Sequence, residues 1–223
     1  MKKVVLFLLA IFFASCSDDD SGTKVKLVRR LVVSSQENPD FNYTYTFKYD
    51  KSGRLTRYDS DYANGPDWVM ISYNSNNTIS RIEQSKNGQI NLVEMTYLDE
   101  ILSQFTKNGV VYQVSYNEST QTYTAGQNSF SLNANGDCTA LPLLSFGFEP
   151  SRFGPFYNAP VSPHRLDFFI SDSNILFFAT RIPVRTIQYG SLSIPLENTY
   201  DSEGFLKTSD FVAEFDVHYE LTY

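Results

Sequence analysis

The sequence predicts an all-β fold, an antiparallel up-and-down meander of hairpins whose sheet is curled or barrel-like. Three observations favour this fold. Aromatic residues make up 15% of the chain, with 18 Phe and 15 Tyr, and such side chains suit the half-buried surface of a sheet. Apolar residues recur at every second position in several segments, which is the period of a strand. Polar corners that contain Gly or Asn separate these segments.

The first fifteen residues have the layout of an export signal. Lys2 and Lys3 give a positively charged start, and an unbroken apolar run over residues 4–13 ends at small residues. A membrane span needs about 20 apolar residues, so this run is too short to be one. We therefore expect residues 1–15 to be removed as a signal peptide.

Cys16 directly follows this signal. The stretch Phe13-Ala14-Ser15-Cys16 resembles a bacterial lipobox, in which small residues precede a Cys that is lipidated and becomes the new N-terminus. Phe13 departs from the aliphatic residue that is usual at its place. The resemblance implies a lipid anchor on Cys16 and a membrane as a partner. The alternative is an ordinary signal with a chance Cys, but an unpaired thiol at the start of an exported chain is harder to explain.

Residues 16–24 predict an acidic tether between the lipid and the folded part. Asp18, Asp19 and Asp20 repel one another and anionic head groups, which keeps the folded part clear of the bilayer. The Cys-Ser-Asp-Asp-Asp arrangement also resembles the export signal of Bacteroidetes-type lipoproteins. That resemblance implies the outer membrane, with the protein facing the cell exterior. A plain solvated linker is the alternative.

Charge and cysteine content exclude several classes of function. The net charge of −7 becomes −9 once Lys2 and Lys3 are removed, and a protein that neutralises phosphates needs a basic face, so we expect no nucleic-acid partner. With Cys16 lipidated, Cys138 is left without a disulfide partner and is interpreted as an inert residue in or beside a strand. Zinc would need several Cys or His residues in close spacing. We expect no metal and no cofactor.

One unit recurs along residues 25–223, which we expect to form a single domain. Tyr45-Thr-Phe47-Lys-Tyr49 reads as a strand, residues 50–53 as a polar turn closed by Gly53, and Leu55 as the start of the next strand. The segment over 69–79 repeats the unit with Asn77 in place of Gly, and Asn also tolerates a left-handed backbone. Further full or partial copies lie at 93–97, 112–117, 130–136 and 200–206.

Two other patterns support consecutive hairpins. Asn-Gly pairs at 64–65, 87–88 and 108–109 are strong hairpin signals where they are flanked by alternating residues. Residues 215–223 close the chain with a strict alternation of apolar and polar positions.

A segment rich in Pro and aromatic residues interrupts the repeats at 141–165. It holds no hairpin unit, and we expect an ordered loop across one end or one face of the sheet. Residues 166–170 and 175–179 then read as buried strands joined by a turn.

The Tyr-Asp-x-x-Gly-x-Leu units at 49–55 and 200–206 resemble YD repeats of the Rhs type. Together with the lipobox, they are similar to a Bacteroides-type family of surface lipoproteins of unknown function with a porin-like antiparallel β fold. The resemblance covers most of the mature chain and implies an up-and-down sheet, but the Pro-rich segment departs from it. It implies no catalytic residues.

A non-catalytic binding or scaffold module is the function that these features favour. Exposed aromatic faces and amide groups suit a carbohydrate or peptide ligand. Trp68, Phe156 and Tyr157 are the candidate ligand-binding residues, because they lie near Pro and Gly loops. For any single aromatic residue, packing in the core is the alternative.

Two other functions stay open. An envelope-associated hydrolase would use His164, Arg165 and Asp167, although the chain has no Gly-x-Ser-x-Gly elbow and His218 reads as a residue of a polar strand face. A membrane-spanning β-barrel is suggested by the alternation that ends at Tyr223. A lipid anchor would be redundant there, and polar residues such as Thr44 and Lys48 would have to face a lumen.

Overall fold

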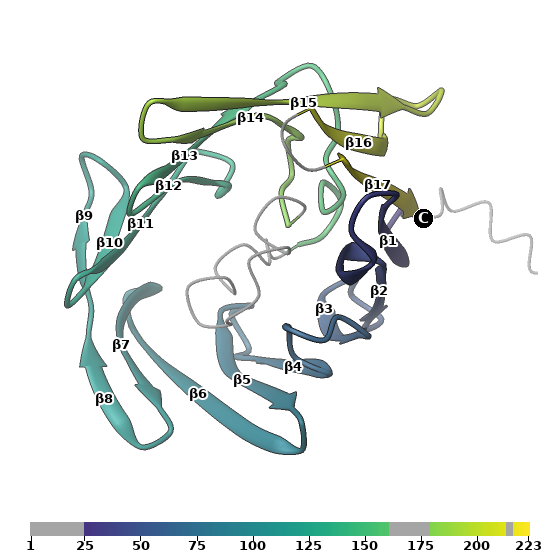
Figure 1. Ribbon diagram of the computed structural model, residues 1–223. Helices are drawn as coiled ribbons and strands as arrows, with labels where there is room; N and C mark the ends of the chain where they lie inside the picture. Colours follow the sequence, from purple (N-terminus) through teal and green to yellow (C-terminus); the bar gives the residue numbers. More distant parts are fainter. Residues whose placement is uncertain (1–24, 161–178, 213–215) are drawn as a thin grey trace, which may run out of the picture.

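The computed structural model describes residues 25–160, 179–212 and 216–223. Within these residues, seventeen antiparallel strands form one sheet that curls into a nearly closed barrel (Figure 1). The described helix is a single short 3-10 turn, η1 (Pro39–Phe41), between the first two strands. The all-β meander predicted from the sequence is therefore confirmed.

Apart from β8 and β9, which follow each other along one segment, each strand pairs with its neighbours in the sequence, so the order around the ring is the order along the chain. The first half of the ring contains β1 (Arg30–Ser35), β2 (Tyr43–Tyr49), β3 (Leu55–Ser60), β4 (Trp68–Tyr73), β5 (Ile79–Lys86), β6 (Gln89–Leu98), β7 (Ile101–Lys107) and β8 (Val110–Gln113). The second half contains β9 (Ser115–Asn117), β10 (Thr122–Ala125), β11 (Asn128–Leu132), β12 (Cys138–Leu141), β13 (Leu144–Phe148), β14 (Val184–Tyr189), β15 (Leu192–Tyr200), β16 (Leu206–Val212) and β17 (Asp216–Thr222).

The ring closes at β1, which pairs with both β2 and β17. Leu31 lies opposite Tyr45 on one side and opposite Leu221 on the other. On the far side of the ring, β8 and β9 are consecutive parts of one extended segment, separated by Val114. β8 pairs with β7 and β9 pairs with β10, so that segment links the two halves.

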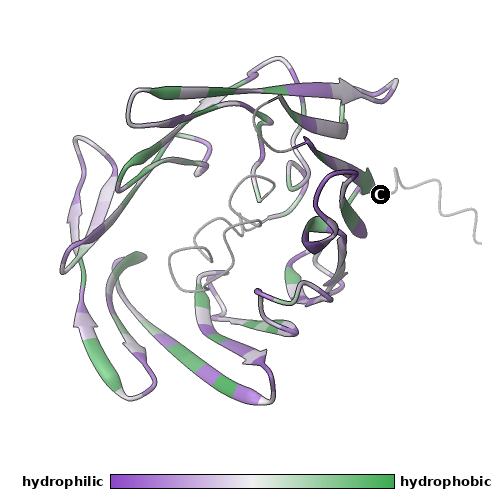
Figure 2. Ribbon diagram, viewed as in Figure 1, coloured by the Kyte–Doolittle hydropathy of each residue, from purple (hydrophilic) through white to green (hydrophobic). Residues whose placement is uncertain are grey.

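Alternation along the strands sorts the side chains into a buried face and a polar face. Figure 2 shows hydrophobic and hydrophilic residues alternating along β6. In β2, Tyr43, Tyr45 and Phe47 are buried, while the intervening residues are partly or fully exposed. Residues 149–160, which follow β13, enter the ring (Figure 1), and Phe156 packs against Phe47 with ring centroids 5.5 Å apart. The apolar face therefore points into the barrel, where it forms the core.

The recurring polar turns fold alike and lie at one end of the barrel. In the turn at 50–54, the Asp50 N–H donates to the Arg54 carbonyl (3.0 Å) and the Gly53 N–H donates to the Asp50 carbonyl (3.0 Å). The same pair of bonds closes three other turns, at 74–78, 133–137 and 201–205. Asn77 has a φ of 67°, so the predicted exchange of Asn for Gly at this left-handed position is confirmed. We call the end that carries these four turns the repeat end.

Short hairpins form the opposite end, which we call the hairpin end. It carries the turns at 87–88, 108–109, 126–127, 142–143 and 190–191. Both residues of the predicted Asn87-Gly88 and Asn108-Gly109 pairs have positive φ, as a two-residue turn of a twisted hairpin requires. The pair Asn64-Gly65 instead lies within a longer loop between β3 and β4.

The start of the Pro-rich segment differs from the prediction. We expected no hairpin over 141–165, but β12 and β13 pair there through a turn at Pro142 and Leu143. Leu143 adopts a φ of 71° and is exposed, so the Pro marks a tight turn rather than a loop. The strands predicted at 166–170 and 175–179 lie outside the described residues, apart from Ala179, which is buried.

Side chains at the repeat end join one repeat to the next. The Tyr73 hydroxyl donates to the Leu55 carbonyl (2.6 Å), and the Tyr223 hydroxyl donates to the Leu206 carbonyl (2.8 Å) in the corresponding place. The guanidinium of Arg54 binds Asp50 (2.7 Å) and lies 4.9 Å from the centre of the Tyr73 ring. These contacts tie neighbouring hairpins at their turns.

Asp50→Ala tests the contribution of a repeated turn. One carboxylate oxygen accepts the N–H groups of Ser52 and Arg54, both at 2.9 Å. Without it, we expect the free energy of unfolding in urea to fall by about 1–3 kcal/mol, whereas the exposed neighbour Lys51→Ala should change it little.

The effect of Asp50→Ala should depend on pH. Burial tends to raise the pKa of Asp50, but the hydrogen bonds from Arg54 and Ser52 outweigh it and lower that pKa below its usual value. The stabilisation is therefore complete above the usual pKa and is lost as the pH falls through the lowered one. A stability difference between the two proteins that persists unchanged to about pH 2 would contradict this role.

Candidate functional site

The structure separates the three aromatic candidates. Phe156 is 2% exposed and lies in the core beside Phe47, so the expectation that its ring lies at the surface is wrong. The Phe156 N–H donates to the Thr180 carbonyl (3.1 Å), which fixes the segment inside the ring. Pro155 correctly predicts that Phe156 lies in a loop. The phenyl side chain is nevertheless buried, because removing so large an apolar group from water stabilises the fold.

Trp68 lies on the outer face of β4. It is half-buried, and the guanidinium of Arg57 sits 5.3 Å from the centre of its ring. Asp59 of β3 and Ser85 of β5 lie directly opposite Trp68 across the sheet. The cation therefore already occupies part of the ring surface that a ligand would need.

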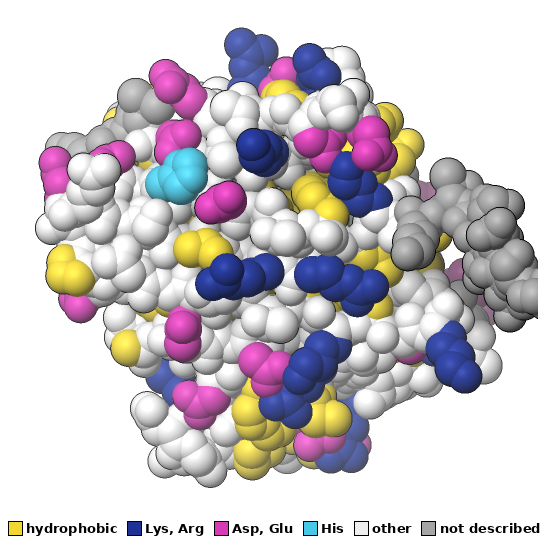
Figure 3. Space-filling view, turned by 90° about the vertical axis from the view of Figure 1, so that its right-hand side faces the viewer, with side chains coloured by type: hydrophobic (Ala, Val, Ile, Leu, Met, Phe, Trp, Pro, Cys, Tyr) yellow, Lys and Arg dark blue, Asp and Glu magenta, His cyan; other side chains and the backbone are white. Residues whose placement is uncertain are grey.

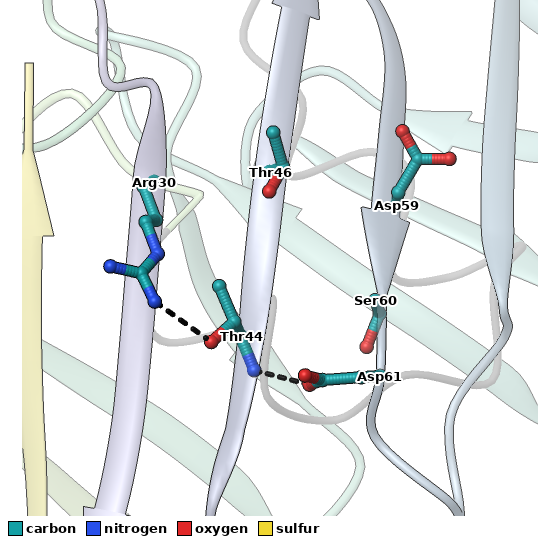
Figure 4. A pocket seen from close by; sticks show the side chains of 6 residues that line it. All are labelled: Arg30, Thr44, Thr46, Asp59, Ser60 and Asp61. Atoms are coloured by element: carbon teal, nitrogen blue, oxygen red, sulfur yellow. Dashed lines mark hydrogen bonds between the residues drawn. The ribbon is translucent and has the colours of Figure 1, made fainter.

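A shallow polar groove adjoins Trp68 on the outer face of β1 to β3 (Figure 4). Arg30 donates to the Thr44 hydroxyl (3.5 Å), and the Thr44 N–H donates to the Asp61 carboxylate (2.5 Å). We call this the outer groove, and it is lined by Arg30, Thr44, Thr46, Asp59, Ser60 and Asp61.

The charged groups of the outer groove already have partners: Arg30 and Asp61 bind Thr44, and Asp59 binds two cations beside the groove. Asp59 accepts from the Nε of Arg57 (2.8 Å) and lies 2.9 Å from the Nζ of Lys48. The hydrogen bond from Arg57 is the main reason why the pKa of Asp59 is lowered, and Lys48 lowers it further. With its carboxylates satisfied and an open shape, the groove offers a ligand few free groups.

A more enclosed hollow lies at the repeat end and contains Tyr157. Its volume is about 470 Å³, and we call it the end hollow. The Tyr157 ring is 44% exposed and lies 4.3 Å, centre to centre, from the Phe153 ring. The end hollow is lined by Asn135, Pro150, Arg152, Phe153, Tyr157, Arg181 and Ile182.

Two arginines give the end hollow its charge. Arg152 stacks over Tyr200, with its guanidinium carbon 4.8 Å from the ring centre. Arg181 donates through one guanidinium nitrogen to the carbonyls of Ala159 (2.8 Å) and Pro160 (3.1 Å). The Nε of Arg181 is buried and makes no hydrogen bond within the described residues. The hollow therefore joins two positive side chains to two aromatic rings.

Asp137 supports the floor of this region from the turn between β11 and β12. It is fully buried, and it accepts the Arg181 N–H at 2.6 Å. Burial raises its pKa, although this hydrogen bond and those from Asn133 and Ile182 oppose the shift. Sequence reasoning missed Arg152, Phe153, Arg181 and Asp137, because residues 133–137, 150–157 and 181–182 meet only in the folded chain.

His218 belongs to a third hollow, of about 380 Å³, on the outer face of β1, β16 and β17. It lies opposite Asp210, with Nδ1 2.6 Å from the carboxylate, and opposite Ser34 on its other side. A Ser, a His and an Asp thus share one cross-strand row. No hydrogen bond joins Ser34 to His218 in the described structure, and both members of the His–Asp pair are about 40% exposed, as expected of a polar strand face.

Other predicted residues lie outside the described part of the chain. These are Cys16 and the proposed hydrolase group His164, Arg165 and Asp167. In residues 25–160, 179–212 and 216–223, no three His, Cys, Asp or Glu side chains gather as a metal site would need.

The same described ranges contain no helix with the length and hydropathy of a membrane span.

Comparisons with known proteins give distant structural similarities, of which two follow. The chain is similar to a porin-like protein from Bacteroides uniformis, with 12% identity and a TM-score of 0.49 over 87% of this chain and 97% of that one. It is also similar to a porin-like protein from Bacteroides vulgatus, with 12% identity and a TM-score of 0.42 over 89% and 98%. No family model and no curated protein matches the sequence.

Phe156→Ala and Tyr157→Ala separate a core residue from a surface one. Removing the buried ring of Phe156 leaves a cavity, so we expect the free energy of unfolding to fall by about 3–5 kcal/mol. Removing the exposed ring of Tyr157 should cost about 1 kcal/mol or less. Urea unfolding of the two variants checks both values, and equal losses would show that the two neighbours are not placed as described.

Proposed function

We propose that this chain is a lipid-tethered, non-catalytic binding module of the cell surface, and that the end hollow binds a carbohydrate. The observation that carries the proposal is the exposed Tyr157 ring beside Phe153, Arg152 and Arg181 in one enclosed hollow. Aromatic faces stack on the apolar face of a sugar ring, while guanidinium and amide groups bind its hydroxyl or acidic groups.

The charge of the end hollow restricts the chemical class of the proposed ligand. Arg152 and Arg181 are both cations, and the lining side chains include no carboxylate. A guanidinium binds carboxylates and other planar anions well. An acidic sugar, such as a uronic acid unit of a polysaccharide, therefore fits this lining better than a basic or purely apolar ligand.

The position of the first described residues supports a tether at the same end. Lys26 binds Asp201 in the turn between β15 and β16 (2.5 Å), and its carbonyl accepts from the Asn158 side chain (3.0 Å). The described chain thus begins at the repeat end, where Lys26 contacts Asn158, the residue that follows Tyr157 in the sequence. The proposed tether over 16–24 would leave beside the end hollow, which suits a ligand that belongs to the envelope.

The outer face of the barrel supports a tethered module over a membrane-spanning barrel. Lys48, Arg57 and Asp59 point outward from β2 and β3, and Arg81 pairs with Glu83 on the outer face of β5 (3.1 Å). Figure 3 shows charges of both signs spread over the side of the ring where β17, β1 and β2 lie. Such side chains are costly against lipid, whereas water solvates them.

Tyr157→Ala tests the carbohydrate site. On an array of acidic and neutral glycans, we expect the wild-type chain to bind acidic members and the variant to bind them at least about tenfold more weakly. Tyr189→Ala is a matched control, since Tyr189 is 54% exposed but lies at the hairpin end. Binding that survives Tyr157→Ala, or no binding to any glycan, would refute the assignment.

Cys16→Ser tests the tether. The lipid would be attached to the Cys16 thiol, and one hydroxyl for one thiol removes that attachment while leaving the barrel unchanged. We expect the wild-type chain in the membrane fraction and the variant outside it. Mass spectrometry of the wild-type N-terminus should show acyl chains on Cys16, and an unmodified N-terminus would contradict the tether.

A further inference from the structure

One edge of strand β8 has no partner strand in the described part of the barrel. β8 pairs with β7, whereas its continuation β9 pairs with β10. β10 ends at Ala125 and turns back at Gly126, opposite the start of β9 rather than β8. The β7–β8 hairpin therefore extends beyond the β9–β10 pair toward the hairpin end (Figure 1).

The ladder identifies which main-chain groups this edge presents. Successive residues of an antiparallel strand point their N–H and C=O groups to opposite edges. The Val114 N–H donates to the Ser103 carbonyl (2.9 Å). The N–H and C=O groups of Val110 and Tyr112, four and two residues earlier, therefore also point toward β7. The N–H and C=O groups of Val111 and Gln113 then point away from β7. They lie on the same edge of the segment as those of Ser115, which lies opposite Thr124 of β10.

The side chains of β8 add an apolar surface to this edge. All four residues of the strand are exposed, with Val110 at 55%, Val111 at 54% and Tyr112 at 40%. The Tyr112 ring stacks on the Phe105 ring, with centres 4.8 Å apart. β8 contains no charged residue and no Pro, the residues that usually protect an exposed edge from pairing.

We propose that the β8 edge is a peptide-binding site, at which an extended, uncharged segment of another protein adds antiparallel to β8. Val111 and Gln113 offer it two N–H donors and two C=O acceptors, the groups that a β-strand satisfies. Val110, Val111 and Tyr112 select β-branched or aromatic side chains on the incoming strand. This site lies at the hairpin end and is separate from the end hollow.

A second copy of this chain is a poorer occupant than another protein. Antiparallel pairing of two β8 strands would turn one barrel upside down relative to the other. If two copies are tethered at their repeat ends to one membrane, as proposed, their β8 strands run in the same direction. They therefore cannot pair antiparallel with each other. The net charge, −7 for the full sequence and −9 once Lys2 and Lys3 are removed, also makes identical copies repel one another.

The test uses the full chain in mild detergent and a fluorescein-labelled peptide with the sequence of residues 101–106, the uncharged part of β7, the strand with which β8 already pairs on its other edge. Amide hydrogen exchange read by NMR reports each residue. We expect the Val111 and Gln113 amides to exchange rapidly in the free protein and at least about tenfold more slowly with saturating peptide. The Tyr112 amide should be protected in both states.

Two variants test the edge by fluorescence anisotropy of the same peptide. Val111→Pro removes the outward N–H and should weaken binding by about tenfold or more, whereas Val111→Thr keeps the N–H and should bind like wild type. No added protection of Val111 and Gln113 at about 1 mM peptide would overturn the proposal, even if Val111→Pro failed to fold. Protection that rises with protein concentration alone would assign the edge to a second copy instead. Tyr157→Ala should bind the peptide normally, which separates this result from that of the carbohydrate site.

Discussion

The inward direction of the apolar side chains is the constraint on which the rest of the structure depends. A strand places successive side chains on opposite faces, so a register shift of one residue would expose the whole buried set. Pairing of β1 with both β2 and β17 holds Leu31, Tyr45 and Leu221 on one row inside the ring. Once the ring closes, the charged residues of the same strands have only the outer face to occupy, and this sorting places charged side chains on the exterior of the barrel.

Four turns with the same hydrogen bonds reverse the chain at one end of the barrel. In three of the four turns the side chain of the first Asp or Asn accepts two main-chain N–H groups. All four reverse the chain at a Gly or Asn with positive φ. Because the turns lie at one end, they also bring charged and aromatic side chains of different repeats together there. The end hollow and Lys26 both lie at this end, whereas the hairpin end carries the five two-residue turns and the unpaired edge of β8.

The local sequence pattern was enough to predict the fold class. It failed where contacts between segments distant in the sequence determine the structure. The turn at 50–53, its copy with Asn77, and the Asn-Gly hairpins all follow from the conformational needs of a few adjacent residues. The β12–β13 hairpin was missed, because Pro142 followed by a non-Gly residue at positive φ resembles a loop in sequence. Nothing in the sequence says that the ring closes, since pairing of β1 with β17 joins residues almost two hundred positions apart.

The candidate sites show the same division. Tyr157 could be selected from its surroundings in the sequence, but Phe156 beside it could not be separated from it, since burial depends on what enters the ring. Arg152, Arg181 and Asp137 are ordinary residues until the turn at 133–137 meets the segment around 152 and 181. The edge of β8 is likewise left without a partner because β10 ends at Ala125, which the sequence of β8 does not indicate.

Cysteine accessibility tests the inward direction of the apolar face most directly. Val33 is 1% exposed on β1, and Thr46 lies on the polar face of β2. With single cysteines at these positions in a chain carrying Cys16→Ser and Cys138→Ala, a water-soluble maleimide should label Thr46→Cys rapidly and Val33→Cys only on unfolding. Rapid labelling of Val33→Cys in the folded protein, with Thr46→Cys protected, would show that the barrel is turned the other way and would contradict the account.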